Sequence, residues 1–116
     1  MGLIQVNGIR VFGYHGCLPE EGRIGGRYVV DVEVRGDFSA AEGSDALTDT
    51  VDYGRVTALV KEQMAVRSKL IEHVARRILD ALRAEWPGHL QWRVVVTKEH
   101  PPVNGAVDRV AYMVEG

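Results

Sequence analysis

The chain has 116 residues, of which 46% are hydrophobic and 26% are charged, with a formal net charge of −2. This length and composition predict one globular domain over residues 1–116. The basic residues are scattered and no apolar run is long enough to span a bilayer, so neither nucleic acid nor membrane is expected as a partner. The single cysteine, Cys17, and the absence of a secretory signal pattern predict a cytoplasmic location.

Two strands are predicted in the first third of the chain. Apolar residues over positions 3–14 predict a strand, with a bulge or bend at Asn7-Gly8. Residues 16–26 are rich in glycine and charge and are predicted to form a loop. Residues 28–35 alternate strictly between Tyr or Val and charged side chains, apart from Val29, which is typical of a strand with one buried face.

Two helices are predicted next. After a polar stretch over residues 41–49, Asp49 or Thr50 can cap a helix that runs to about Val66 and carries one apolar stripe. Ser68 is the expected N-cap of a second helix, which repeats apolar residues at the spacing i, i+3, i+4, i+7 and ends at Pro87-Gly88.

Two more strands are predicted over residues 92–97 and 107–114, joined by a connection rich in proline and glycine. The order β-β-α-α-β-β predicts an α+β fold, in which a four-stranded antiparallel sheet carries two antiparallel helices on one face. The other face and at least one edge stay uncovered. Closing the sheets of several subunits into a barrel would cover them, so we expect a ring-shaped homo-oligomer.

Lys98 ends a strand whose other residues on the same side, at positions 92, 94 and 96, are apolar. It is either a strand-end charge that reaches water or a functional amine held against a surface of low dielectric constant. Spacing alone favours the first interpretation, because long lysine side chains reach solvent readily.

Other polar side chains begin helices or lie in the first loop. Glu72, in the first turn of the second helix, complements the helix dipole, and it could also take a planar donor pair from a heterocycle. Tyr53 lies near the apolar stripe of the first helix, which favours a core or interface position. Glu20 and Glu21 are adjacent in the loop, and spacing does not choose between them.

No metal site or cofactor is predicted. The histidines at positions 15, 73, 89 and 100 form none of the H-x-H, H-x-x-H or H-E-x-x-H pairs typical of zinc sites, and Cys17 has no partner at ligand spacing. A glycine-rich phosphate loop and a G-x-S-x-G nucleophile elbow are also missing.

Four motifs taken together resemble those of the dihydroneopterin aldolases. Residues 12–21 read FGYHGCLPEE and resemble the family's G-Y-H-G-x-x-x-x-E, and residues 49–53 read DTVDY and resemble D-T-V-x-Y. Residues 70–73 read LIEH and resemble L-[LI]-E-x, and residues 97–102 read TKEHPP and resemble K-x-x-x-P. The resemblance covers essentially the whole chain, in order and with similar spacing.

This resemblance implies the tunnelling fold, in which β-β-α-α-β-β subunits form a barrel-like ring and two rings stack into an octamer. Active sites lie between adjacent subunits. The implied reaction is that of an aldehyde lyase of folate biosynthesis, which cleaves 7,8-dihydroneopterin into 6-hydroxymethyl-7,8-dihydropterin and glycolaldehyde. The C6=N5 imine of the substrate accepts the electrons, so neither a Schiff base nor a metal is needed.

The resemblance also implies residue roles. Lys98 would be the acid/base residue, acting with a bound water, and Tyr53 would assist proton transfer. Glu72 would accept the 2-amino and N3–H donors of the pterin, with a backbone contact from Ile71. Glu21 would hold the hydroxylated end of the substrate or the water.

Three rival functions remain open from the sequence. Some aldolases of this family also epimerise C2′, and a dihydroneopterin or dihydroneopterin-triphosphate epimerase would use the same lysine and tyrosine, with Arg23 and Arg27 as candidates to bind a triphosphate. A zinc-dependent tunnelling-fold enzyme is disfavoured by the missing histidine pair. A non-catalytic pterin-binding ring is disfavoured because the site positions keep reactive side chains.

Overall fold

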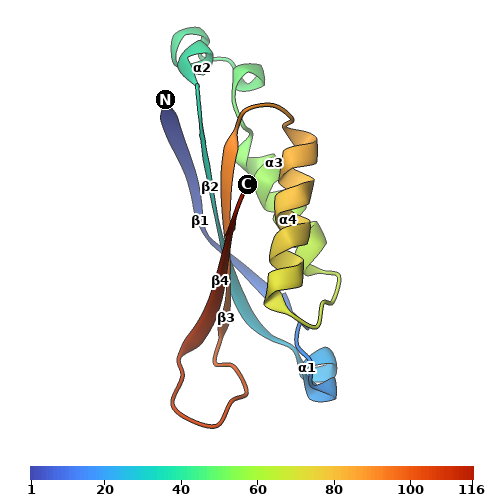
Figure 1. Cartoon of the computed structure of the whole chain (residues 1–116). Helices are drawn as coiled ribbons and strands as arrows, with labels where there is room; N and C mark the ends of the chain where they lie inside the picture. Colours follow the sequence, from blue (N-terminus) through green and yellow to red (C-terminus); the bar gives the residue numbers. More distant parts are fainter.

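The computed structural model describes residues 1–116 and contains one four-stranded antiparallel sheet in the order β1-β2-β3-β4 (Figure 1). The strands are β1 (Gly2–Gly13), β2 (Gly26–Gly36), β3 (Gln91–Glu99) and β4 (Arg109–Glu115). Each strand pairs with the next one along the chain. The predicted four-stranded antiparallel sheet is therefore confirmed, although β4 begins at Arg109 rather than at position 107.

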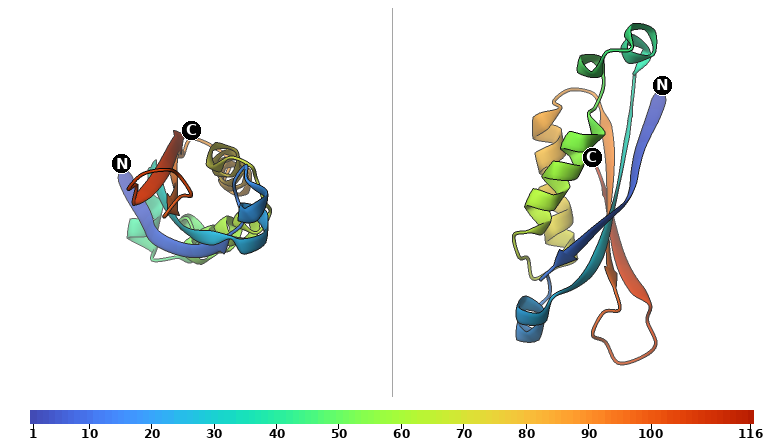
Figure 2. Two further views of the ribbon diagram at one scale, coloured as in Figure 1. Left: turned by 90° about the horizontal axis from the view of Figure 1, so that it is seen from below. Right: turned by 180° about the vertical axis from the view of Figure 1, so that it is seen from behind.

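The two long helices, α3 (Tyr53–Met64) and α4 (Ile71–Glu85), lie side by side on one face of the sheet, as predicted. Figure 2 shows the sheet curving along the helix pair, which leaves its other face open. The apolar stripes of both helices meet the inward side chains of β2 and β3 in a core of 18 buried residues. The molecule is elongated, with extents of 52 × 25 × 20 Å.

A bulge interrupts the pairing of β1 with β2 at the predicted place. The register shifts between Val6 and Ile9, and Gly8 adopts a φ of 74°, a left-handed conformation that glycine reaches without strain. Asp31 on β2 accepts a hydrogen bond from the backbone N–H of Gly8 at 2.7 Å. The inward positions of β1 are therefore even-numbered before the bulge (Ile4, Val6) and odd-numbered after it (Ile9, Val11).

Two segments predicted without helical structure contain short helices. The loop over residues 16–26 contains α1 (Pro19–Ile24). The polar stretch over residues 41–49 overlaps the end of α2 (Ser39–Ser44) and contains the 3-10 turn η1 (Leu47–Asp49). None of these helices has a buried residue. Hydrophobic periodicity, the signal that predicts longer helices, is absent from such short exposed turns.

Both predicted helix caps were displaced. Asp52, rather than Asp49 or Thr50, caps α3 and accepts hydrogen bonds from the N–H groups of Gly54 and Arg55. α4 starts at Ile71 after the N-cap position Leu70, so Ser68 is not its cap. The Ser68 hydroxyl instead lies between His73 and Arg77, described below.

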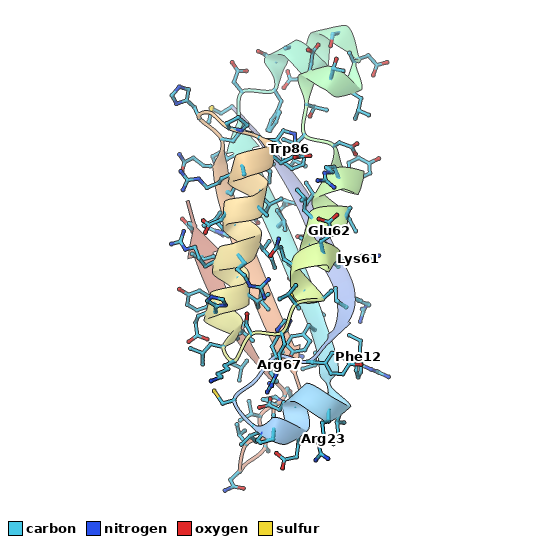
Figure 3. All side chains as sticks on the ribbon, turned by 90° about the vertical axis from the view of Figure 1, so that its right-hand side faces the viewer. Phe12, Arg23, Lys61, Glu62, Arg67 and Trp86 are labelled. Carbon is cyan, nitrogen blue, oxygen red and sulfur yellow. The ribbon has the colours of Figure 1, made fainter.

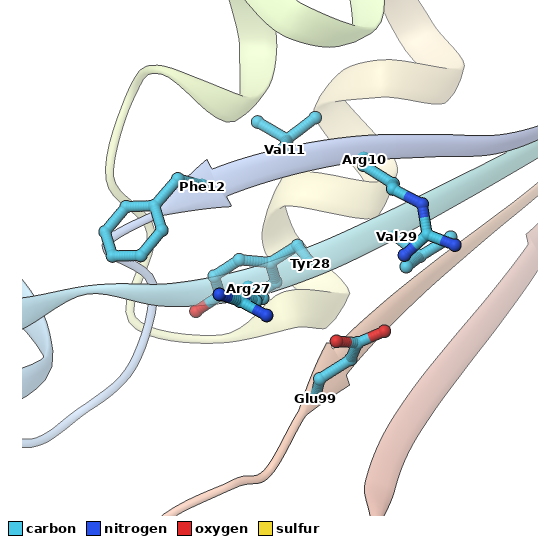
Figure 4. Close-up of a pocket in the computed structure, with 7 residues that line it drawn as sticks. All are labelled: Arg10, Val11, Phe12, Arg27, Tyr28, Val29 and Glu99. Atoms are coloured by element: carbon cyan, nitrogen blue, oxygen red, sulfur yellow. The ribbon is translucent and has the colours of Figure 1, made fainter.

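The face of the sheet opposite the helices is open. It contains a hollow of about 310 Å³ near the ends of β1, β2 and β3, shown in Figure 4. Two arginines that make no ion pair border this hollow, and its full lining is Arg10, Val11, Phe12, Arg27, Tyr28, Val29 and Glu99. None of the helices combines the length and the apolar character needed to cross a bilayer.

Candidate active site

Lys98 and Glu21 form an ion pair at the end of the molecule where α1 lies. Alternation along β3 turns Lys98 to the helix side of the sheet, with the buried residues Trp92, Val94 and Val96. Its Nζ contacts Glu21 Oε2, and the two side chains are only 15% and 13% exposed. A pair withdrawn from solvent in this way is held more firmly than a surface ion pair.

The carboxylate of Glu21 is held on both oxygens. Oε1 accepts the backbone N–H of Leu18 at 3.1 Å, while Oε2 accepts from Lys98. Burial alone would raise the pKa of Glu21, but the hydrogen bonds from Lys98 and Leu18 hold this pKa below its ordinary value. Glu21 is therefore an ionised acceptor at neutral pH, oriented by α1.

The second acceptor of the Lys98 ammonium is a backbone carbonyl. Lys98 Nζ donates to the carbonyl oxygen of His15 at 2.9 Å. The same oxygen accepts the hydroxyl of Tyr28 at 2.7 Å. Tyr28 is Lys98's partner in the register of β2 and β3, so the sheet itself brings both donors to one carbonyl.

The loop that carries this carbonyl is bonded to the turn between α3 and α4. The His15 ring is fully buried and its Nδ1 accepts the N–H of Ser68 at 3.0 Å, while Gly16 N–H donates to the Ser68 carbonyl at 3.0 Å. Arg67, labelled in Figure 3, donates to the carbonyls of Tyr14, Gly16 and Leu18 at 2.9–3.2 Å. These bonds fix the loop relative to the start of α4.

The turn itself is fixed by Arg77 on α4. Its guanidinium donates to the carbonyls of Gln63 and Val66 and to the hydroxyl of Ser68, each at 2.7–2.8 Å. Because Ser68 Oγ accepts from Arg77, its own proton is free to go to His73 Nδ1, 2.8 Å away. This tertiary use of the hydroxyl is the physical reason that Ser68 does not cap α4.

Gly16 is required for the approach of Glu21. Its φ of 142° is in the region that favours glycine, and a Cβ at this position would overlap the Glu21 carboxylate. The glycine of the G-Y-H-G motif therefore leaves space for the carboxylate that pairs with Lys98.

Lys98 and Glu21 form one wall of a cleft of about 400 Å³, whose other wall is the start of α4. Ile71 and Glu72 line this wall, and their backbone N–H groups donate no hydrogen bond within the chain. The cleft thus offers a carboxylate and two free donors on one side and an ammonium on the other. Its full lining is Gly16, Cys17, Leu18, Glu21, Lys69, Leu70, Ile71, Glu72, Lys98, Pro101, Pro102, Val103 and Val110.

A smaller cavity of about 180 Å³ also borders Lys98 and Glu21. His15, Tyr28 and His100 are among its lining residues. The ion pair therefore stands between two hollows, with polar groups on both sides.

Tyr53 is the one predicted site residue that the fold leaves away from this cleft. It is the first residue of α3, whose N-terminal end points away from α1 (Figure 1), and it lines neither cavity beside Lys98. Its side chain is 69% exposed, so the predicted core position is wrong, whereas the predicted interface position is not tested within one chain.

Sequence reasoning missed the residues that hold the loop, namely His15 as a structural group, Tyr28, Arg67 and Arg77. One signal was available for Tyr28, a hydroxyl-bearing side chain on the inward face of an otherwise valine-lined strand. No local signal marks the arginines, because their partners are carbonyls distant in sequence.

His15 makes the stability of the protein sensitive to acid. Burial, followed by the positive charge of Arg77, lowers the pKa of His15 below its ordinary value, so the folded state keeps the ring neutral. In the unfolded state the ring binds a proton below about pH 6.5, and the free energy of unfolding should therefore fall by up to about 1.4 kcal/mol per pH unit below that value.

Urea unfolding at pH 7.5 and pH 5.5 measures this effect. His15→Asn keeps an acceptor for the Ser68 N–H but does not titrate, so it should show a smaller loss between the two pH values than the wild type. His89→Asn, at an exposed histidine, should lose as much stability as the wild type. An equal loss in all three proteins would show that His15 is not the acid-sensitive group.

No group of three or more His, Cys, Asp or Glu side chains is arranged so that it could hold a metal ion. The histidines have other surroundings: His15 and His73 bond to the Ser68 region, while His89 and His100 lie in connections beside the strands.

Comparisons with known proteins agree along the whole chain. The family model for dihydroneopterin aldolase matches residues 4–115. A dihydroneopterin aldolase of Staphylococcus epidermidis is 42% identical over 109 residues, which are 93% of this chain and 90% of the relative. One from Streptococcus pyogenes is 38% identical over 116 residues, 99% of this chain and 98% of the relative.

Solved structures show the same fold. The structure of Escherichia coli dihydroneopterin aldolase in complex with neopterin superimposes with a TM-score of 0.90 at 22% identity, covering 100% of this chain and 99% of that one. A Burkholderia dihydroneopterin aldolase bound to guanine gives a TM-score of 0.77 at 20% identity, covering 99% of this chain and 89% of that one. With the family match over residues 4–115 and the identities to the two bacterial relatives, the chain belongs to the dihydroneopterin aldolases, a family of lyases.

Proposed function

We propose that the cleft between the Lys98–Glu21 pair and the start of α4 binds 7,8-dihydroneopterin and cleaves its side chain by a retro-aldol reaction. The observation that carries this proposal is that Lys98, on β3, and Glu72, at the start of α4, line one cleft of about 400 Å³. The solved relatives bound to neopterin and to guanine support a ligand of this chemical class.

The carboxylate wall suits the pterin ring. The 2-amino group and N3–H of a dihydropterin form a planar pair of donors, and the Glu72 carboxylate can accept both. The free N–H groups of Ile71 and Glu72 can donate to ring acceptors at the same helix start. Binding here would leave the C6 side chain of the substrate to extend toward Lys98.

The ammonium wall suits proton transfer. The reaction begins from the neutral amine form of Lys98: the 2′-hydroxyl passes its proton through a bound water to the Nζ lone pair, which turns Lys98 into the ammonium that can later give the proton back. The C1′–C2′ bond then breaks, glycolaldehyde leaves with a new C2′=O bond, and the bonding electrons pass through C1′ into the C6=N5 imine. Protonation at C1′ restores the imine and gives 6-hydroxymethyl-7,8-dihydropterin, so the substrate itself is the electron acceptor.

The relay water has a place beside Lys98. The cavity of about 180 Å³ borders both Lys98 and Glu21, and a water molecule occupies about 30 Å³ in the liquid. In this scheme Glu21, ionised and fixed on both oxygens, accepts a hydrogen bond from the water or from the hydroxylated end of the substrate.

We further propose that Tyr53 enters this cleft from an adjacent copy of the chain. Tyr53 is exposed at the other end of the α3–α4 layer, so a ring of copies that places this end against the next cleft would supply the missing hydroxyl. Exposed apolar side chains support such an assembly, both at the cleft (Leu70, Val103) and on β4 (Val110, Met113). A barrel-like tetramer, stacked as an octamer in the cytoplasm, is the proposed form.

Product analysis after incubation with 7,8-dihydroneopterin tests the function. Chromatography should show 6-hydroxymethyl-7,8-dihydropterin and glycolaldehyde in equal amounts. Appearance of the C2′ epimer alone would make the protein an epimerase on the same scaffold. Tight pterin binding without any conversion would contradict the enzymatic proposal and indicate a binding ring.

A further inference from the structure

Tyr28 is a buried tyrosine at a position where the core by itself requires no hydroxyl. The side chain is 1% exposed and stands on the inward face of β2, whose other inward residues are Val30, Val32 and Val34. Burying a hydroxyl in such a layer is costly unless the hydroxyl finds a hydrogen-bond partner. The partner of Tyr28 is the His15 carbonyl, which is also an acceptor of the Lys98 ammonium.

The shared carbonyl determines where Lys98 points. An ammonium has three N–H donors in a tetrahedral arrangement. Two of them are directed at fixed acceptors, the His15 carbonyl and Glu21 Oε2. The third direction is then set by geometry, and it is the position from which a proton is given to, or taken from, a group in the cleft.

His15 belongs to a segment, residues 14–18, that has neither helix nor strand structure. Its carbonyl is therefore not held by a ladder of backbone hydrogen bonds. The ring is anchored to Ser68 and packs edge-on against the Tyr28 ring, with the centroids 5.1 Å apart. Two side chains donate hydrogen bonds to this carbonyl. One is Lys98, and the other is the Tyr28 hydroxyl, at 2.7 Å.

From these contacts, and resting on the function proposed above, we infer that Tyr28 is a positioning residue, whose hydroxyl fixes the His15 carbonyl and thereby aims the Lys98 amine into the cleft. Tyr28 lines the small cavity but not the cleft that would hold the pterin ring. Its removal should therefore affect the proton-transfer step rather than pterin binding.

The variant Tyr28→Phe tests this role, because it keeps the ring in the core and removes only the hydroxyl. We expect kcat to fall about tenfold, because a catalytic group that loses its alignment reacts more slowly. KM should change less than about twofold, since Glu72 and Ile71 are untouched. The matched control is Tyr112→Phe, at a half-exposed tyrosine of β4 that borders neither cavity.

The split between kcat and KM is a readout that a purely structural role would not move. A loss of core stability alone would lower the Tm without lowering kcat selectively, and Tyr112→Phe should leave both kcat and KM at the wild-type values.

A second readout needs no substrate. The lysines of the chain are Lys61, Lys69 and Lys98, so ¹⁵N-lysine labelling gives few side-chain signals, and Lys98→Met identifies the one from Lys98. Its ammonium protons should exchange with water faster in Tyr28→Phe than in the wild type. Unchanged exchange and an unchanged kcat, even with a lower Tm, would overturn the inference. If Tyr28→Phe showed faster exchange but the wild type had no turnover, the proposed function would be contradicted and the positioning role of Tyr28 would stand.

Discussion

Replacing Lys98 with Met should lower kcat for dihydroneopterin cleavage by about a thousandfold, the usual scale for losing a general acid/base. Met keeps the apolar stem of the side chain against the core and removes only the amine. Glu21 then loses its ion-pair partner, so Tm should be measured alongside kcat. A variant that folds normally and keeps kcat within tenfold of the wild type would show that another group carries the proton.

The same variant tests whether the site is shared between subunits. Lys98→Met and Tyr53→Phe should each be nearly inactive alone. After the two are co-expressed and assembled together, about a quarter of the sites in a random ring would combine an intact Lys98 from one copy with an intact Tyr53 from its neighbour. Recovered activity would support the shared site. Continued inactivity in verified mixed rings would mean that both residues act from the same chain or that Tyr53 has no role.

Replacing Glu72 with Gln should raise KM by about ten- to a hundredfold and change kcat much less. Gln keeps the size of the side chain, but its amide offers one acceptor and one donor group to a substrate edge that presents two donors. Losing a charge-assisted hydrogen bond costs about 1.5–3 kcal/mol, which corresponds to this range of KM. Steady-state kinetics with 7,8-dihydroneopterin measures the change.

Asp80→Asn is the matched control for Glu72→Gln. It removes an exposed carboxylate from the same helix, at a position that does not line the cleft, and its ion pair with Arg76 is at the surface. Its KM should equal that of the wild type. If Glu72→Gln gave an unchanged KM as well, the pterin would have to bind elsewhere than at the start of α4.

The sequence predicts well those features that depend on alternation or on helical spacing. The inward direction of Lys98 follows from the apolar residues two, four and six positions earlier, and the bulge in β1 follows from Asn7-Gly8. The pairing of strands follows from their order, because the two hairpins and the helix pair leave few other arrangements.

Features that depend on tertiary partners could not be predicted in this way. Ser68 has the residue type of an N-cap, yet Arg77 and His73 take its hydroxyl, and the helix starts three residues later. The choice of Glu21 over Glu20 depended on the family motif, because only the fold of α1 shows which carboxylate faces Lys98. The roles of Lys98, Tyr53, Ile71, Glu72 and Glu21 stay predictions until the variants are measured.

The bulge in β1 accommodates one extra residue without changing which side chains face the core. Asn7 and Gly8 together stand opposite Asp31, while Val6 pairs with Val32 and Ile9 pairs with Val30. Deleting Gly8 would leave Asn7 alone opposite Asp31, and the strand could then pair regularly with Ile9 and Val11 still turned inward. The segment that carries the His15 carbonyl would keep its place beside Lys98 and Tyr28. The number of residues in β1 can therefore differ at this point while the geometry at the far end of the strand is preserved.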